Sequence, residues 1–440
     1  MKAITFKDID HLNQSYDQKP VQKALQRVLY KNDMQTAFEV QDVYQQNQFK
    51  FSNEIKTMPV ANQKQSGRCW IFAGLNVIRE QAAKKYGLKT FELSQNYTAF
   101  WDKFEKINYF IEAIDDFLDA DQDDRTLQHL LKTGIQDGGQ WDMFVALVLK
   151  YGVVPQDAMS ETVASSKTAF MNRLINIKLR QYAATARKLF KEGNKALIPS
   201  VKKQFLDEFY TFLVTSFGQP PQTFDFEYVT NDTYQVIKNL TPQSFYEDIY
   251  GGQIENYVSI INSPTEDKPF NKTYTVSYLG NVVGGHDIKY LNLEMSELKA
   301  LVIKQLLNGE VVWFGSDVAR FGDRQAGVWD DKAYDFELLG MSFELDKKDQ
   351  LDYSQSAMNH AMVITAVHLE DLKPVRWKIE NSWGDSSGQK GYYLASDSWF
   401  DQYVYQAVIH KQYLSKENLK DWEEEPKVLK PWDPMGALAK

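Results

Sequence analysis

The feature that most constrains this chain is the junction at residues 63–75, where an irregular loop runs into an apolar segment and carries the only cysteine, Cys69. From Trp70 onward apolar residues recur at helical spacing until Gly87, which is typical of the end of a helix. The sequence therefore predicts a helix whose first turn contains Cys69. Unpaired N–H groups and the positive end of the helix dipole favour an anion there, so we expect a lowered thiol pKa.

The surroundings of this cysteine favour a nucleophile. A lone cysteine is more often a small buried hydrophobe. Here the thiol lies between Arg68 and Trp70 after a Ser-Gly pair, which is a poor setting for core filling. Gln63 lies in the loop upstream, and its side-chain amide could donate a hydrogen bond to the oxyanion that forms when the sulfur attacks a carbonyl. Such a nucleophile also requires a base and a group that orients the base.

His360 is the candidate base among the six histidines, because it precedes the β-branched run 361–367, which predicts a buried strand. A second short strand ends at Asn381. Neighbouring strands would place Asn381 beside His360, so that one ring nitrogen is held and the other faces Cys69, with Trp383 shielding the hydrogen bond from water. Taken singly, His360 could be a core histidine and residues 381–384 only a tight turn. The order Cys, His, Asn favours a catalytic trio.

These motifs resemble those of the papain-like cysteine peptidases, in the branch of bleomycin hydrolase and bacterial aminopeptidase C. The shared motifs lie along essentially the whole chain, at Gln63, 66–70, 137–141, 359–361, 381–384 and 431–439. The motif at 431–439 is the most discriminating. Ser66 stands where secreted relatives carry a cysteine, which fits a protein without a disulfide.

The resemblance implies an α+β, two-lobed papain-like fold with a large, mostly helical insertion and a C-terminal arm entering the cleft. The cysteine and the histidine lie 291 positions apart, whereas roughly 130–150 are expected of a compact papain-like enzyme. The expected parts are an N-terminal arm at 1–60, a helical lobe carrying Cys69 at 61–155, the insertion at 156–285, a β-rich lobe carrying His360 and Asn381 at 286–425, and the tail at 426–440. Strands are predicted at 311–315, 361–367, 376–379, 391–394 and 405–409.

The tail decides what kind of peptidase is expected. A terminal segment with three prolines is unconstrained by default. The resemblance implies instead that it occupies the non-primed side of the cleft, bordered by Gly138 and Gly139, where its terminal carboxylate pairs with the α-ammonium of the substrate. Only a substrate with a free N-terminus then fits. Because Lys440 extends one residue beyond the family pattern, we hypothesise that the enzyme removes it and leaves Ala439 as the anchor.

The expected activity is therefore that of a cysteine aminopeptidase acting on peptides through a thioester. Cys69 attacks, Gln63 and the Cys69 N–H hold the oxyanion, His360 moves the proton, and Asn381 orients the ring. No cofactor and no metal are expected, since the histidines show no ligand spacing. The alternatives that stay open are an endopeptidase with a mobile tail, an acyl transferase using the same residues, and a non-catalytic scaffolding protein.

Charge and composition bear on partners and location. The net charge is −9, and without a basic groove interleaved with aromatic residues a nucleic-acid partner is not expected. Residues 167–203 hold ten Lys or Arg and one acidic residue, which is either a solvated face or a basic wall facing a neighbouring subunit or an anion. The absence of an apolar leader or span and the single cysteine predict a cytoplasmic protein. The family resemblance implies a homohexamer.

Overall fold

Helix α5 (Cys69–Tyr86) is buried along most of its length and packs against strand β10 (His360–Glu370) at the centre of the molecule. Gly87 ends the helix in the left-handed conformation, with φ +65°, which glycine adopts without steric cost. The predicted start and end of this helix are both confirmed. The computed structural model describes residues 1–440.

One mixed sheet of twelve strands forms the β-rich half, in the order β14-β5-β6-β4-β13-β7-β10-β11-β12-β9-β8, with β1 paired to β10. Its strands are β1 (Asn53–Glu54), β4 (Tyr257–Ile261), β5 (Lys272–Val276), β6 (Tyr290–Asn292), β7 (Val312–Ser316), β8 (Gly322–Asp323), β9 (Val328–Trp329), β10, β11 (Lys373–Glu380), β12 (Tyr392–Ser396), β13 (Val404–His410) and β14 (Lys427–Leu429). The five predicted strands are confirmed as β7, β10, β11, β12 and β13. A separate hairpin is formed by β2 (Phe224–Thr230) and β3 (Thr233–Leu240).

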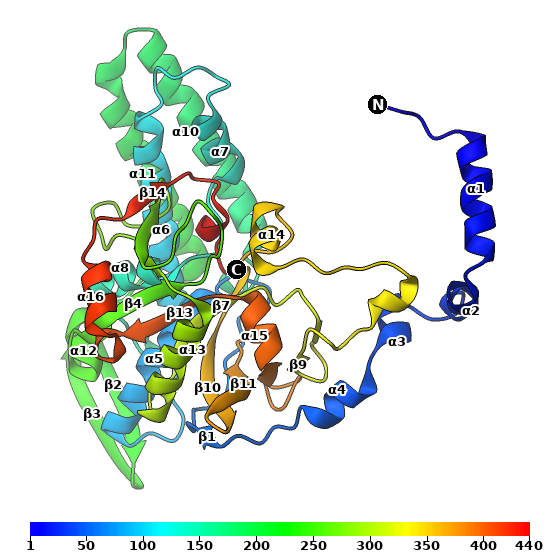
Figure 1. Ribbon diagram of the computed structural model, residues 1–440. Helices are drawn as coiled ribbons and strands as arrows, with labels where there is room; N and C mark the ends of the chain where they lie inside the picture. The colour runs from blue at the N-terminus through cyan, green and yellow to red at the C-terminus, as the bar shows by residue number, and fades with distance from the viewer.

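The helices surround this sheet and form the other half (Figure 1). They are α1 (Phe6–Asp17), α2 (Pro20–Leu29), α3 (Met34–Phe38), α4 (Gln41–Gln46), α5, α6 (Gln95–Asp115), α7 (Arg125–Thr133), α8 (Trp141–Tyr151), α9 (Val163–Ser166), α10 (Ala169–Lys191), α11 (Ile198–Phe217), α12 (Pro242–Tyr250), α13 (Met295–Leu307), α14 (Lys347–Asp352), α15 (Asp397–Tyr403) and α16 (Lys416–Trp422). The predicted α+β class is confirmed.

The sheet separates two hydrophobic cores. Along β10, Ala361 and Val363 point into the larger core, which also contains α5 and α8, whereas Met362 and Ile364 point into the smaller core beneath α13 and α15. This alternation follows the two-residue period of a strand. Because both faces of β10 are buried, its first residue is held in a fixed position.

The insertion contains both helical and sheet elements. Helices α10 and α11 form a hairpin that projects from the body (Figure 1), while β4 and β5, from the same range 156–285, join the central sheet. Within the basic stretch, Lys202 forms ion pairs with Glu112 and Asp115 of α6 at 2.8 and 2.9 Å. The five-part division of the chain stays a prediction.

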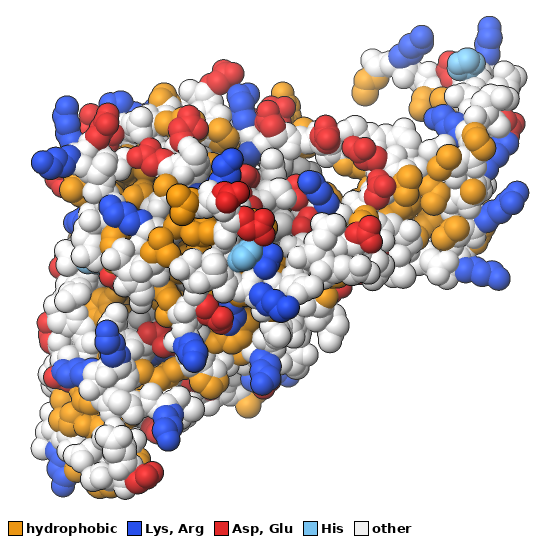
Figure 2. Space-filling model, turned by 60° about the horizontal axis from the view of Figure 1, so that its bottom comes forward, with side chains coloured by type: hydrophobic (Ala, Val, Ile, Leu, Met, Phe, Trp, Pro, Cys, Tyr) orange, Lys and Arg blue, Asp and Glu red, His pale blue; other side chains and the backbone are white.

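The N-terminal arm leaves the body of the protein. Figure 1 shows α1 and α2 at the end of an extension, and α1 buries no side chain. Figure 2 shows hydrophobic side chains gathered on the same extension. The exposed apolar side chains of the arm include Ile4, Phe6, Leu12, Val21, Val28, Tyr30 and Met34. None of the helices is both long and apolar enough to cross a membrane.

Candidate active site

The sulfur of Cys69 lies where the two halves of the molecule meet. Its side chain is completely buried at the first position of α5. Sγ accepts a hydrogen bond of 3.4 Å from the backbone N–H of Ala361, the residue that follows His360. The start of the central helix and the start of strand β10 therefore meet at this sulfur.

His360 and Asn381 are joined directly. Nε2 of His360 lies 2.8 Å from Oδ1 of Asn381, which also accepts the N–H of Ser382 at 2.7 Å. The imidazole lies against the indole of Trp383, with ring centroids 4.9 Å apart. Antiparallel pairing of β10 with β11 brings these residues together, as expected from the two strand ends. Because the amide oxygen contacts Nε2, the other ring nitrogen points away from Asn381, and the backbone of Lys440 also forms a hydrogen bond with the imidazole.

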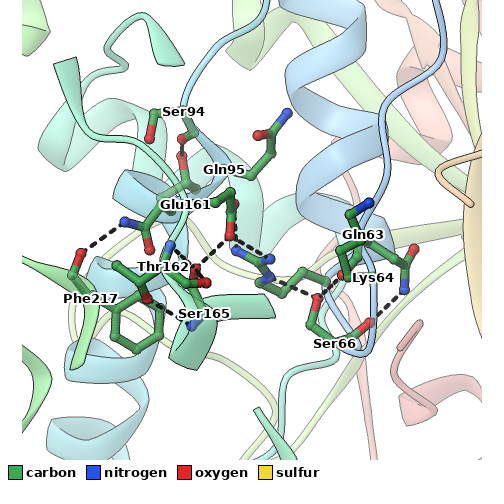
Figure 3. Close-up of polar contacts among 12 residues, drawn as sticks. Gln63, Lys64, Ser66, Ser94, Gln95, Glu161, Thr162, Ser165 and Phe217 are labelled. Carbon is green, nitrogen blue, oxygen red and sulfur yellow. Dashed lines mark hydrogen bonds and ion pairs between the residues drawn. The ribbon is translucent and has the colours of Figure 1, made fainter. Parts of the chain in front are cut away.

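Gln63 is held from both ends of its amide. Its Nε2 donates to the carbonyl oxygen of Ser66 at 2.6 Å (Figure 3), and its Oε1 accepts the hydroxyl of Ser382 at 2.5 Å. The hydroxyl of Ser66 donates back to the Gln63 carbonyl at 2.6 Å, and Arg68 Nε donates to that hydroxyl at 2.9 Å. One N–H of the Gln63 amide remains for a ligand. The role of Ser382 as a partner of Gln63 was not anticipated from the sequence.

Asp137 links the cysteine loop to helices α6 and α10. Its carboxylate accepts the backbone N–H of Gly67 at 2.9 Å and the ammonium of Lys103 at 2.5 Å, and its carbonyl accepts the indole N–H of Trp70 at 2.7 Å. Thr168 and Asn172 also donate to this carboxylate. Although burial raises the pKa of Asp137, the charge of Lys103 and these hydrogen bonds hold it well below its usual range.

The C-terminal tail lies in the cleft. Ala439 and Gly139 form an antiparallel bridge, with the N–H of Gly139 donating to Ala439 at 3.0 Å and the N–H of Ala439 donating back at 3.2 Å. The N–H of Lys440 donates to the carbonyl of Asn359 at 3.0 Å. A Cβ at Gly138 would lie 2.8 Å from the Leu438 Cβ, so only glycine fits beside the tail. The structure thus brings Gly138, Gly139, Ala439 and Lys440 to the site.

The tail is anchored upstream of the cleft. Strand β14 pairs with β5, and the guanidinium of Arg125 lies 3.9 Å from the ring centroid of Trp432. The buried ammonium of Lys268 contacts the Asp433 carboxylate at 3.0 Å. A cavity of about 570 Å³ remains between the tail and helices α6 and α7, lined by residues that include Tyr109, His129 and Trp432. These contacts hold the tail upstream of the last residues, which lie in the cleft.

Burial sets the protonation of the cysteine and the histidine. Burial raises the pKa of Cys69 to about 12, although backbone N–H groups, including that of Ala361, lower it. Burial lowers the pKa of His360 to about 4, although hydrogen bonds to Asn381 and to the backbone of Lys440 raise it. The prediction of a lowered thiol pKa is wrong for this arrangement, because complete desolvation outweighs the helix start. With the tail in place, the neutral thiol and the neutral imidazole are favoured.

The remaining ionisable groups offer no metal site. No three His, Cys, Asp or Glu side chains converge in a geometry that could hold a metal ion. The arrangement that does exist combines a thiol, an imidazole held by the amide of Asn381, and the amide of Gln63 held in the loop that leads to the thiol. Together these groups can perform nucleophilic acyl transfer.

Known proteins with similar sequences and structures were compared with the chain. A model of the peptidase C1-like family matches residues 3–436. Relatives called aminopeptidase C include one from Lactobacillus delbrueckii subsp. lactis, 51% identical over 88% of both chains, and one from Listeria monocytogenes, 45% identical over 99% of both. Among solved structures, PepW from Lactobacillus rhamnosis HN001 superimposes with a TM-score of 0.98 at 48% identity, covering 99% of each chain.

Proposed function

The chain belongs to the peptidase C1-like family and is a cysteine aminopeptidase, and from this premise we propose that it releases N-terminal residues from short peptides at Cys69, His360 and Asn381. The same comparisons confirm the predicted papain-like fold. The observation that carries the proposal is the antiparallel bridge between Ala439 and Gly139, because it fills the non-primed side of the cleft with the protein's own chain.

The chemistry begins when Cys69 loses its proton to His360 and the sulfur attacks the first peptide carbonyl. The N–H of Cys69 and the free N–H of Gln63 stabilise the oxyanion, and the hydroxyl of Ser382 holds the Gln63 amide for this task. His360 then protonates the leaving amine, and a water activated by the same ring hydrolyses the thioester. Asn381 keeps the ring oriented throughout.

The position of Lys440 supports a role for its removal. Its backbone is hydrogen-bonded to both Asn359 and His360, so the chain end occupies the place of a substrate acyl group. In this register it is Lys440, and not Ala439, whose backbone contacts His360, so we infer that cleavage of the Ala439–Lys440 bond requires the tail to advance by one residue. Once Lys440 is removed, the carboxylate of Ala439 becomes the terminus, and it lies one residue from the catalytic pair, where a substrate α-ammonium would bind.

Two amide substrates distinguish this function from an endopeptidase with a mobile tail. A free-amine dipeptide amide and its N-acetylated twin are incubated with the wild type, with Cys69→Ala as the inactive control. We expect turnover of the free-amine substrate alone. Equal cleavage of the acetylated twin would show that the tail does not block longer chains. Trapping of the acyl-enzyme by hydroxylamine, with little hydrolysis in its absence, would indicate an acyl transferase instead.

We further propose that the enzyme works as a homo-oligomer in the cytoplasm, a hexamer by its resemblance to the family. The exposed apolar side chains of the N-terminal arm support association, since the single chain leaves them open to solvent. The use of the only cysteine as a nucleophile supports a reducing compartment. Light scattering of the full chain and of a variant lacking residues 1–52 tests the oligomer: we expect the arm-deleted variant to have the smaller mass.

A further inference from the structure

Arg324 extends a row of stacked groups that begins at the catalytic histidine. Its guanidinium lies 4.3 Å from the ring centroid of Trp383, and that indole lies 4.9 Å from the ring of His360. Arg324 follows β8 and its side chain is exposed. A cation, an indole and the imidazole thus lie in sequence from solvent to the active site.

This cation has no acidic partner in the protein. None of the ion pairs involves Arg324, whereas its neighbour Arg320 contacts the Asp317 carboxylate at 3.2 Å. Its contact with the face of Trp383 orients the guanidinium without neutralising it. The charge reaches the catalytic ring, because Arg324 contributes to lowering the pKa of His360 after the larger effect of burial. The guanidinium also forms a side-chain hydrogen bond with Tyr393, and its remaining donors are available for an anion.

Arg324 lies apart from the residues that hold the tail. The tail contacts Gly67, Gly138, Gly139 and Asn359, and none of its hydrogen bonds involves Trp383 or Arg324. Since the tail fills the non-primed side, the indole and the guanidinium are left to face the part of the substrate that departs as the amine. The stacking intervals of 4.3 and 4.9 Å set an upper bound on the span from the imidazole to the guanidinium, and the contact between guanidinium and carboxylate takes up part of it. A leaving part of one or two extended residues, at roughly 3.3–3.6 Å per residue, can therefore reach Arg324.

We propose that Arg324 binds the α-carboxylate of the leaving part of the substrate, and that the enzyme thereby prefers dipeptides and tripeptides over longer peptides. This inference rests on the proposed aminopeptidase activity. The tail carboxylate would recognise the amino end of the substrate, and Arg324 would recognise the carboxyl end. A bidentate pair between guanidinium and carboxylate fixes the orientation of the carboxylate and also stabilises its charge. The distance between the tail carboxylate and the Arg324 guanidinium then limits the length of a substrate that can contact both.

The test compares kcat/KM for alanyl-alanine and for alanyl-alaninamide, which differ only in the terminal carboxylate. In the wild type we expect the free acid to be favoured. In Arg324→Ala the free acid should lose about three- to tenfold while the amide is unchanged, as for a partly exposed charge-assisted contact. Arg324→Lys should retain part of the preference. Lys332→Ala removes an exposed cation from the same region and should behave as the wild type.

The outcomes separate this proposal from the proposed function. Equal losses on both substrates in Arg324→Ala would mean that the guanidinium only supports Trp383, and would overturn carboxylate recognition. Unchanged kinetics on both substrates would overturn it as well. In either case turnover of the amide by the wild type still establishes the aminopeptidase activity, because that substrate carries no carboxylate. The preference should also weaken as ionic strength rises, which a purely structural role would not produce.

Discussion

The backbone N–H of Lys440 donates a hydrogen bond of 3.0 Å to the carbonyl of Asn359, the residue directly before His360. The last residue of the chain is thereby fixed inside its own active site. A peptide held at this place blocks substrate as a bound product would. In the proposed function the tail is therefore both a specificity element and, while Lys440 remains, an obstruction.

We predict that active enzyme removes Lys440. Intact-mass measurement should find the purified wild type ending at Ala439 and the Cys69→Ala variant ending at Lys440, because removal requires the thiol. If both proteins keep Lys440, self-removal is wrong. A chain encoded to end at Ala439 provides the matched control, and it should turn over a free-amine dipeptide amide without a lag.

Replacing Gln63 should impair the chemical step. Gln63→Ala is expected to lower kcat on the order of 10²- to 10³-fold, because one oxyanion donor is lost. Ser382→Ala removes only the hydroxyl that holds the Gln63 amide at 2.5 Å, so we expect a smaller loss of roughly tenfold, in line with one hydrogen bond. Single-turnover kinetics would measure both. A larger loss of kcat for Ser382→Ala than for Gln63→Ala would contradict the assignment of Gln63 as the oxyanion donor and of Ser382 as its support.

The buried ion pair between Asp137 and Lys103 should contribute far more to stability than the more exposed ion pairs of Lys202. Asp137→Asn leaves the buried ammonium of Lys103 without its counter-charge, at a cost of about 3–5 kcal/mol in the free energy of unfolding. Lys202→Gln breaks the more exposed pairs with Glu112 and Asp115 and should cost about 1 kcal/mol or less. Chemical denaturation of the two variants beside the wild type measures the difference. Similar losses would show that the Asp137 site is not held by charge.

The buried imidazole of His360 should make stability depend on pH. Its pKa falls from 6.5 to about 4 in the folded protein, so between these values the unfolded chain binds the proton and the folded chain does not. The free energy of unfolding therefore decreases as pH falls from about 6.5 towards 4. Between pH 7 and 4.5 the wild type should lose about 2 kcal/mol more than His360→Gln, which cannot titrate. Parallel losses in the two proteins would indicate a solvated ring.

Local patterns were sufficient to predict the helix and the strand that carry the candidate catalytic residues. The apolar spacing after Trp70 predicts the helix that begins at Cys69, and the β-branched run after His360 predicts the strand that holds the base. Both are short-range features, because the periodicity of a helix or a strand depends only on residues that are close together in the sequence. The sequence also supplied the tail motif, through its resemblance to a family.

Contacts between distant segments decided the rest. Asp137 contacts Gly67 and Lys103, Ser382 contacts Gln63, and Arg324 stacks on Trp383, and no periodicity in the chain encodes these partners. The pKa of the Cys69 thiol was also not predictable from local sequence. A helix start favours the thiolate, yet burial in the closed cleft raises the pKa to about 12. The sequence by itself determined the candidate residues and the elements on which they lie. Only the tertiary structure decided their protonation and their partners, because desolvation depends on which remote segments fold over them.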